Sequence, residues 1–442
     1  MTDATMTTNG GLDPQSRSEL TVDKVRRGLA VRYAAEKRFK ALGFGAVCLG
    51  LLFLVLLIGS ITLKGYSAFW NYEILIEVPL DEKALDPEGK RDPKALAAAD
   101  YGVLIKKATF ALFPEVTDRR EKRELAGLVS SGAQFDLRDR VLANPDLIGQ
   151  TVVVAAAIDD EADMFLKGHI SRETDEADRR VKDYKIKWLD KLQAEGRIAS
   201  HFNTTFFTAG DSRDPEQAGI WGASMGSFYT LIVTLALSFP LGVAAAIYLE
   251  EFAPKNRLTD IIEVNINNLA AVPSIVFGLL GLAVFINLFG MHRSIPLVGG
   301  LVLTLMTLPT IIIASRAALK AVPPSIRQAA LGIGASPMQT ILFHVLPLAM
   351  PGMLTGTIIG MAQALGETAP LLMIGMVAFI VDVPQGFTDS ATALPVQIYL
   401  WADSPERAFV ERTSGAILVL LIFLILMNAL AVLLRRQFER RW

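Results

Sequence analysis

Cysteine and histidine are scarce in this chain of 442 residues, which contains one cysteine and four histidines. The single cysteine, Cys48, excludes an intramolecular disulfide and any metal site built from several thiolates. The histidines lack the close pairing that is typical of metal ligands, since they lie at His169, His201, His292 and His344. We therefore expect neither redox chemistry nor a metal site in this protein.

An excess of positive charge is also absent. The chain contains 43 Lys and Arg residues and 45 Asp and Glu residues, which gives a net charge of −2. Nucleic-acid binding draws much of its affinity from cations on phosphates, so no nucleic acid is expected as a partner. The loops show no nucleophile–base pair that would indicate an enzyme. Apolar residues, by contrast, make up 52% of the chain, which is high for a soluble protein.

Long apolar runs predict an α-helical polytopic membrane protein. A helix that crosses the hydrocarbon layer needs roughly 20 mostly apolar residues, and about six segments meet this requirement. They are approximately 42–63, 225–248, 264–288, 295–315, 353–379 and 414–434. The first run is too long and starts too late for a cleaved signal peptide, so we expect it to remain as the first span.

Basic residues cluster at both ends of the chain and predict its orientation. Segments 1–41 and 435–442 are rich in Lys and Arg next to the first and last spans, and such residues favour the cytoplasmic side. Both termini are therefore expected in the bacterial cytoplasm, with segment 64–220 outside the inner membrane.

The external segment 64–220 has the size of a small domain. Alternation at 72–79 predicts a strand, and 200–208 reads as a second one. Helices are expected at 94–113, 119–130 and 179–196, which makes this a mainly helical α+β domain. An acidic stretch, which includes Asp163, is expected to be solvated surface rather than a cation site.

The loop 321–347, between the fourth and fifth expected spans, is the most informative segment. Proline favours the first turn of a helix, so one short helix is expected after the Pro323–Pro324 pair and another from Pro337. Gly332 and Gly334 supply the bend between them. The small residues of this segment make a thin element that could fit into a groove of another protein.

This loop resembles that of the permease subunits of bacterial ATP-binding-cassette (ABC) importers. Their motif runs Glu-Ala-Ala, three residues, Gly, nine residues, Ile, any residue, Leu-Pro. This chain keeps every spacing with Gln328, Ala329, Ala330, Gly334, Leu346 and Pro347, although Gln328 and His344 replace the usual Glu and Ile. The resemblance implies a type I importer permease domain at 221–434, whose loop docks on a separate ATPase that binds ATP and Mg²⁺. This chain has no phosphate-binding Gly-x-x-x-x-Gly-Lys-Ser/Thr loop of its own.

Two further stretches, 271–279 and 364–372, are similar to segments of phosphate-importer permeases. That resemblance implies phosphate as substrate, with a second related permease, two ATPase subunits and a periplasmic phosphate-binding protein as partners. The external domain resembles an insertion that only some members of the family carry. No cofactor of its own is implied for this chain.

Glu367 is the sole carboxylate in the expected span 353–379, near its middle. A charge at that depth is costly and indicates function, and Pro370 leaves the carbonyl of Gly366 without its helical donor. An ionised Glu367 could accept a hydrogen bond from the O–H of hydrogen phosphate, which sulfate lacks. A structural bond between helices is the alternative. The other candidate pathway residues are Gln363, Thr368 and Ser274.

Family permeases often carry an Arg where this chain has Gln363, so a basic partner for Glu367 must come from elsewhere, from Arg316 or a second subunit. A permease for sulfate or molybdate remains an alternative function. A membrane sensor is less favoured, because few residues follow the last span to form an output domain. A secondary transporter would show an internal repeat, which is not evident.

Overall fold

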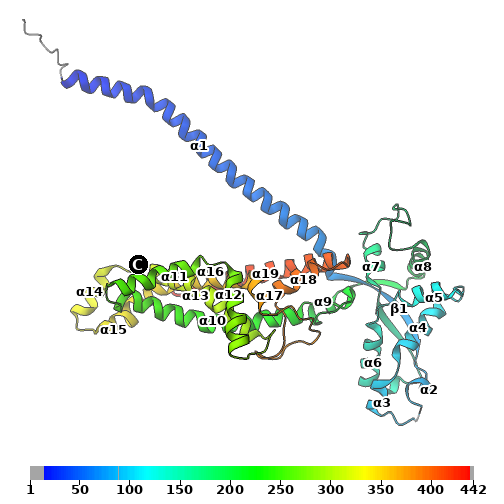
Figure 1. The fold of residues 1–442 in the computed structure, drawn as a ribbon. Coiled ribbons are helices and arrows are strands. Elements are labelled where there is room, and N and C mark those ends of the chain that lie inside the picture. The colour runs from blue at the N-terminus through cyan, green and yellow to red at the C-terminus, as the bar shows by residue number, and fades with distance from the viewer. Residues whose placement is uncertain (1–13, 88, 439–442) are drawn as a thin grey trace, which may run out of the picture. The chain divides into compact units, whose positions relative to one another are not determined.

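The computed structural model describes residues 14–87 and 89–438, so the ends of the expected basic segments 1–41 and 435–442 lie outside the described residues. The chain forms two units, Met1–Ile61 and Thr62–Trp442. The first unit contains most of helix α1 (Pro14–Gly65), whose apolar part belongs to a candidate span at Val31–Phe69 (Figure 1).

Five helices among the described residues are long and apolar enough to cross a membrane, or six if one bent helix pair counts as a span. Besides Val31–Phe69 they cover Trp221–Phe252, Pro296–Ala321, Pro337–Gly366 and Ala408–Leu433, and the bent pair covers Arg257–Ala270 and Ser274–Leu288. This confirms the expected helical membrane protein of about six spans.

Two of the expected spans are not single helices. The third consists of α11 (Arg257–Ala270) and α12 (Ser274–Gly281), and these are bent by 101° across a break that contains Pro273. The prediction of one continuous helix for the fifth span, 353–379, is wrong. Helix α16 (Leu346–Gly366) ends at Gly366, and the short helix α17 (Ala369–Met373) follows. Apolar composition marks a membrane segment, whereas the glycine and the prolines of the segment decide where its helix stops.

Helix α13 (Pro296–Ala321) lies between α10 (Trp221–Ile247) and α16, and small residues allow the close approach. A Cβ atom added at Gly242 of α10 would lie 2.7 Å from Cγ2 of Ile311, and one at Gly356 of α16 would lie 2.1 Å from Cβ of Ala314. Helices α18 (Leu394–Ala402) and α19 (Ala408–Phe438) complete the group (Figure 1). Backbones this close leave no space for larger side chains.

The segment between the first two spans contains a three-stranded antiparallel sheet in the order β2 (Thr151–Ala157), β1 (Trp70–Pro79), β3 (Ile198–Phe202). In the register, Ile74 of β1 pairs with Ala156 and with Ile198. Buried side chains from the sheet and the surrounding helices form one hydrophobic core. The helices are α2 (Glu82–Leu85), α3 (Pro93–Ala98), α4 (Tyr101–Leu112), α5 (Arg119–Ala126), α6 (Ala133–Ala143), α7 (Asp160–Leu166) and α8 (Asp183–Ala194).

The expected α+β character of this segment is confirmed, although several boundaries differ. The expected helix at 94–113 divides into α3 and α4, because the side chain of Asp100 caps α4 by accepting a hydrogen bond from the amide of Val103. The expected strand at 200–208 is half wrong. Its second half is helix α9 (Thr204–Thr208), which Asn203 caps at the amide of Phe206. Strand β2 was not expected, because the Val and Ala residues that follow Thr151 show no alternation of polar and apolar residues.

Candidate functional site

The loop with the family motif forms a hook of two short helices, α14 (Pro324–Gly332) and α15 (Pro337–Thr340). Both helices begin at the expected prolines. Gly334 lies between them with φ of +94°, a left-handed conformation that side chains rarely adopt. Ser336 and Gln339 then close a capping box at the start of α15. The hook is therefore a locally determined turn.

Of the motif residues in the hook, Gln328, Ala329 and Gly334 are exposed, while Ala330 is buried. Leu346 is half-buried and Pro347 exposed at the first turn of α16. A π-helical turn, Ile341–Val345, joins α15 directly to α16. The hook thus continues into a span without a flexible linker.

Large apolar side chains of the hook, taken together with the π-helical turn Ile341–Val345 that follows it, are exposed to an unusual degree. Ile333 is 83% exposed and Phe343 is 70% exposed, and they are accompanied by Leu331, Met338 and Leu342. The hook carries few charges of its own. A contiguous exposed apolar patch on a protein surface indicates a contact with another protein or with lipid.

The base of the hook is held by Arg327 and Glu251, a pair that the sequence did not single out. The guanidinium donates to the Glu251 carboxylate over 2.6 Å and 3.2 Å. It also donates to the carbonyls of Val322 and Leu319, at 2.8 and 3.0 Å. Arg327 directly precedes the motif residue Gln328, and Glu251 follows the apolar run 225–248. The available signal was therefore a basic residue in the hook and an acidic residue at the end of an expected span.

The second candidate site is the helix break at Gly366–Pro370. Glu367 is the C-terminal cap of α16 with an extended backbone, rather than a residue in the middle of a helix. Glu367 and Thr368 are half-buried, Gln363 is exposed, and Pro370 is buried. Pro370 has no N–H group to donate to the carbonyl of Gly366. The helix breaks at this point, as the sequence indicates.

The structure brings together the two stretches that resemble phosphate-importer permeases. Gly278 of α12 packs directly on the second stretch, and an added Cβ would lie 2.7 Å from Cα of Pro370 and 2.8 Å from Cβ of Met373. Ser274 is half-buried at the start of the same short helix. The helix break that contains Glu367 therefore packs against α12.

Arg316 is not the partner of Glu367 within this chain. Its guanidinium contacts Glu263 at 2.6 Å and Glu250 at 3.4 Å, and the described residues show no ion pair that includes Glu367. Two carboxylates nearby satisfy the charge of Arg316. The expectation from the sequence that Arg316 could pair with Glu367 is therefore wrong within this chain.

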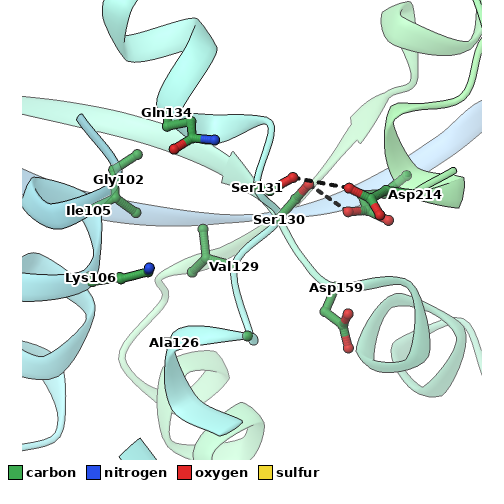
Figure 2. Close-up of a pocket in the computed structure, with 12 residues that line it drawn as sticks. Gly102, Ile105, Lys106, Ala126, Val129, Ser130, Ser131, Gln134, Asp159 and Asp214 are labelled. Carbon is green, nitrogen blue, oxygen red and sulfur yellow. Dashed lines mark hydrogen bonds between the residues drawn. The ribbon is translucent and has the colours of Figure 1, made fainter. Parts of the chain in front are cut away.

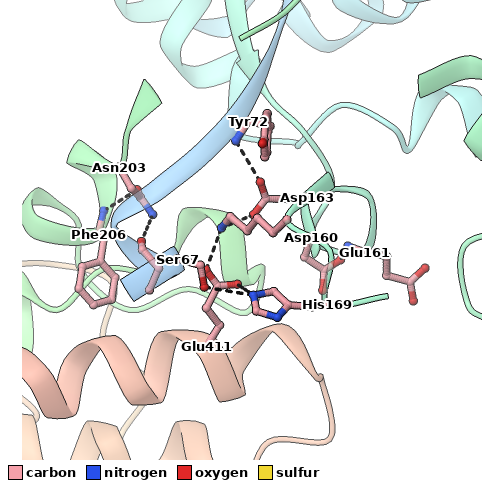
Figure 3. A network of polar contacts seen from close by, with 11 residues as sticks. Ser67, Tyr72, Asp160, Glu161, Asp163, His169, Asn203, Phe206 and Glu411 are labelled. Carbon is pink, nitrogen blue, oxygen red and sulfur yellow. Dashed lines mark hydrogen bonds and ion pairs between the residues drawn. The ribbon is translucent and has the colours of Figure 1, made fainter. Parts of the chain in front are cut away.

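A buried ion network joins segment 64–220 to the start of α19 (Figure 3). Lys167, which follows α7, contacts Asp163 at 2.6 Å and Glu411 at 2.8 Å, and all three side chains are at most 8% exposed. Asp163 also accepts a hydrogen bond from the amide of Tyr72. The expectation that Asp163 belongs to a solvated surface is wrong. Burial of Asp163 raises its pKa, and Lys167 opposes the rise.

Segment 64–220 also contains a cavity of about 350 Å³ (Figure 2). It is lined by residues of α4, by residues between 126 and 131, by Asp159, and by Asp214 and Glu216. Burial and the negative charge of Asp160 raise the pKa of Asp159 to about 7, and Lys185 opposes the shift. Burial likewise raises the pKa of Glu216, which accepts from the hydroxyl of Ser130 at 2.6 Å.

Residues 238–442 match the family "Binding-protein-dependent transport system inner membrane component". Residues 26–176 match a domain of unknown function, DUF3333. A relative from Mycobacterium tuberculosis, "Phosphate transport system permease protein PstA 1", is 33% identical over 229 residues, which are 51% of this chain and 74% of the relative. This chain belongs to the inner membrane components of binding-protein-dependent transport systems. It is thus a multi-pass permease component of an ABC transporter and not an enzyme, in a family without a bound cofactor.

A Bacillus subtilis relative, "Probable ABC transporter permease protein YqgI", is 35% identical over 173 residues, or 39% of this chain, and the match spans only 58% of that relative. Among solved structures, the MetNI methionine ABC transporter in an inward-facing conformation matches 50% of this chain and 98% of its own, at 20% identity and a TM-score of 0.41. The family match establishes the expected ABC importer permease fold for the second half of the chain.

Proposed function

We propose that this chain is the channel-forming permease subunit of an importer of inorganic phosphate. The observation that carries the proposal is the similarity over 229 residues to a relative named as a phosphate transport system permease. The family match at residues 238–442 includes the break at Gly366–Pro370 and Gly278, which packs on it. In both stretches the chain resembles phosphate permeases. Glu367 would then accept a hydrogen bond from the O–H group of hydrogen phosphate.

The hook supports coupling to a separate ATPase subunit. Its exposed apolar side chains, led by Ile333 and Phe343, suit burial in a groove, and its rigid continuation into α16 suits the transmission of movement. Two such ATPases, which carry ATP and Mg²⁺, a second related permease and a periplasmic phosphate-binding protein would complete the importer. The motif Gln328–Gly334 and Leu346–Pro347 would form the docking element.

The proposed topology places both termini and the hook in the cytoplasm, with segment 64–220 in the periplasm. Basic residues near the first and last spans support this orientation. The hook can meet a cytoplasmic ATPase only in this orientation. The domain limits proposed from the sequence, 42–63, 64–220 and 221–434, follow from the same orientation.

The deciding experiment reconstitutes the complex in lipid vesicles and measures ATP hydrolysis with the binding protein loaded with phosphate, sulfate or molybdate. Stimulation by the phosphate-loaded protein alone, with accumulation of phosphate in the vesicles, is the expected result. Stimulation by sulfate or molybdate instead would assign a related oxyanion. An absence of stimulation with all three would reject the importer proposal.

A further inference from the structure

Three ion pairs at the hook end of the helix group connect four separate elements. Arg327 of α14 pairs with Glu251, and Glu250 beside it pairs with Arg316 of α13. Arg316 also reaches Glu263 of α11, at 2.6 Å. Glu250 and Glu251 both lie on one π-helical turn, Tyr248–Phe252, at the end of α10. The pairs therefore form a chain of contacts from the hook to α11.

These charges are largely shielded from solvent. The side chains of Arg316, Glu250 and Glu251 are 14%, 18% and 11% exposed, and those of Arg327 and Glu263 are 23% and 33% exposed. Removing one partner of such a pair leaves a charge without compensation in a poorly solvated place. The contacts consequently favour movement of the connected elements together over separation.

Helix α11 depends on this connection more than its neighbours do. None of its residues is buried in this chain, so it lacks the hydrophobic anchoring of α10 or α13. Its ion pair from Glu263 to Arg316 joins it to α13. At its other end α11 passes through the 101° bend into α12, and α12 carries Gly278, on which the break at Pro370 packs.

We propose that Arg316 is a positioning residue that transmits movement of the ATPase-bound hook, through Glu263, to α11 and α12. This inference rests on the proposed function and extends it with a route to the break that contains Glu367. The guanidinium suits the task because its fixed fork of donors holds two carboxylates from different helices at once. The π-helical turn with Glu250 and Glu251 links the two ends of the route.

The test uses Glu263→Gln, which removes the negative charge of the ion pair between α11 and Arg316 while Arg316 keeps its contact with Glu250. Lys320→Gln is the matched control. Lys320 lies on the same helix as Arg316 and contacts the same Glu250 at 3.5 Å, but its side chain is 60% exposed. The assembled complex of each variant is compared for copurification with the ATPase, basal hydrolysis, and hydrolysis stimulated by the loaded binding protein.

Glu263→Gln is expected to retain copurification and basal hydrolysis and to lose stimulation at least fivefold, while Lys320→Gln matches the wild type. Wild-type stimulation in Glu263→Gln would overturn the proposal. Loss of copurification in that variant would also overturn it, because Glu263 would then support assembly of the complex instead of transmitting movement.

A second measurement does not depend on the transported substrate. Hydrogen exchange of residues 257–270 is compared between complexes with and without ATP. Exchange in the wild type is expected to change with ATP, and the change is expected to disappear in Glu263→Gln but not in Lys320→Gln. A change of equal size in Glu263→Gln, or none in the wild type, would refute the role of Arg316. Failure of phosphate to stimulate the complex would affect only the proposed function.

Discussion

The ammonium group of Lys167 lies 2.8 Å from the carboxylate of Glu411, although 244 positions separate the two residues in the sequence. Lys167 belongs to the segment between the first two spans, and Glu411 lies in the first turn of the last helix. Both side chains are nearly inaccessible to solvent. Segment 64–220 is therefore anchored to the last helix by a buried charge pair, in addition to the chain connections at its two ends.

Replacement of Lys167 by Met should strongly destabilise this anchor. It leaves Asp163 and Glu411 buried without their shared cation, and loss of one partner of a buried pair costs about 3–5 kcal/mol. We expect a lower melting temperature of the detergent-solubilised protein, monitored by tryptophan fluorescence. Adding Glu411→Gln should recover part of the loss. Arg172→Gln breaks a pair with Asp190 whose side chains are 57% and 46% exposed and should leave melting nearly unchanged. Equal melting of Lys167→Met and wild type would contradict the anchor.

Asp159 should make the stability of segment 64–220 depend on pH. Its pKa is raised to about 7, above an unfolded value of about 3.9, so the folded state favours the protonated carboxyl. The stability that Asp159 contributes is fully present below about pH 4 and is lost as the pH rises through 7. Asp159→Asn should therefore stabilise the protein at pH 8, by about 1–3 kcal/mol, and have little effect near pH 4.

Melting curves of the two forms from pH 4 to pH 8 provide the measurement for Asp159. Asp139→Asn, at a carboxylate whose side chain is 65% exposed, is the control and should not alter the profile. A constant difference between Asp159→Asn and wild type across this range would show that titration of Asp159 is not involved.

Glu367→Gln should reduce discrimination between phosphate and sulfate. The variant loses an ionised acceptor for the phosphate O–H and gains an amide that can donate to sulfate. We expect the phosphate preference in vesicle uptake to fall by roughly tenfold or more. Asp403→Asn, at an exposed carboxylate that caps α18, is the control. An unchanged preference in Glu367→Gln would instead favour a structural hydrogen bond.

Gly278→Val should disturb the seat of the helix break. The added Cβ would lie 2.7 Å from the Cα of Pro370, and backbone atoms cannot move aside as a flexible side chain can. Overpacking of this kind costs about 1–3 kcal/mol, so lower melting temperature and lower uptake are expected. Gly50→Ala, at a glycine with no atom within 4 Å of its added Cβ, should behave as wild type. Normal uptake by Gly278→Val would argue that this packing is dispensable.

Ile333→Asp should abolish docking of the ATPase without unfolding the permease. The side chain is 83% exposed, so its replacement should change stability by less than about 0.5 kcal/mol. Loss of an apolar anchor at an interface can cost about 2 kcal/mol or more in binding. Copurification of the ATPase with the permease measures the effect. Phe135→Asp, at a 46% exposed residue of segment 64–220, is the control and should retain copurification. Retained copurification with Ile333→Asp would exclude the hook surface as the docking site of the ATPase.

The hook was predicted correctly in its local structure because its determinants are local. Pro324 and Pro337 start the two helices, and Gly334 takes the left-handed turn between them. The end of α16 at Gly366 was missed. The sequence remains apolar beyond Gly366. Apolar composition indicates that a segment lies in an apolar environment, but it does not show whether the helix is continuous there. Strand β2 was missed for a related reason, since it has no alternating pattern.

Composition and short-range pattern thus determined by themselves that this chain spans a membrane, that about six segments do so, and where a proline-bounded hook interrupts them. Each of these properties depends on residues within one helix turn or one hydrophobic run. Only the tertiary structure shows that Arg316 pairs with Glu263 rather than with Glu367. It also decides that Gly278 packs against Pro370 and that Lys167 forms an ion pair with Glu411. A charged side chain pairs with whichever opposite charge the folded chain brings within a few ångströms. The separation of the two residues in the sequence does not predict which pair forms.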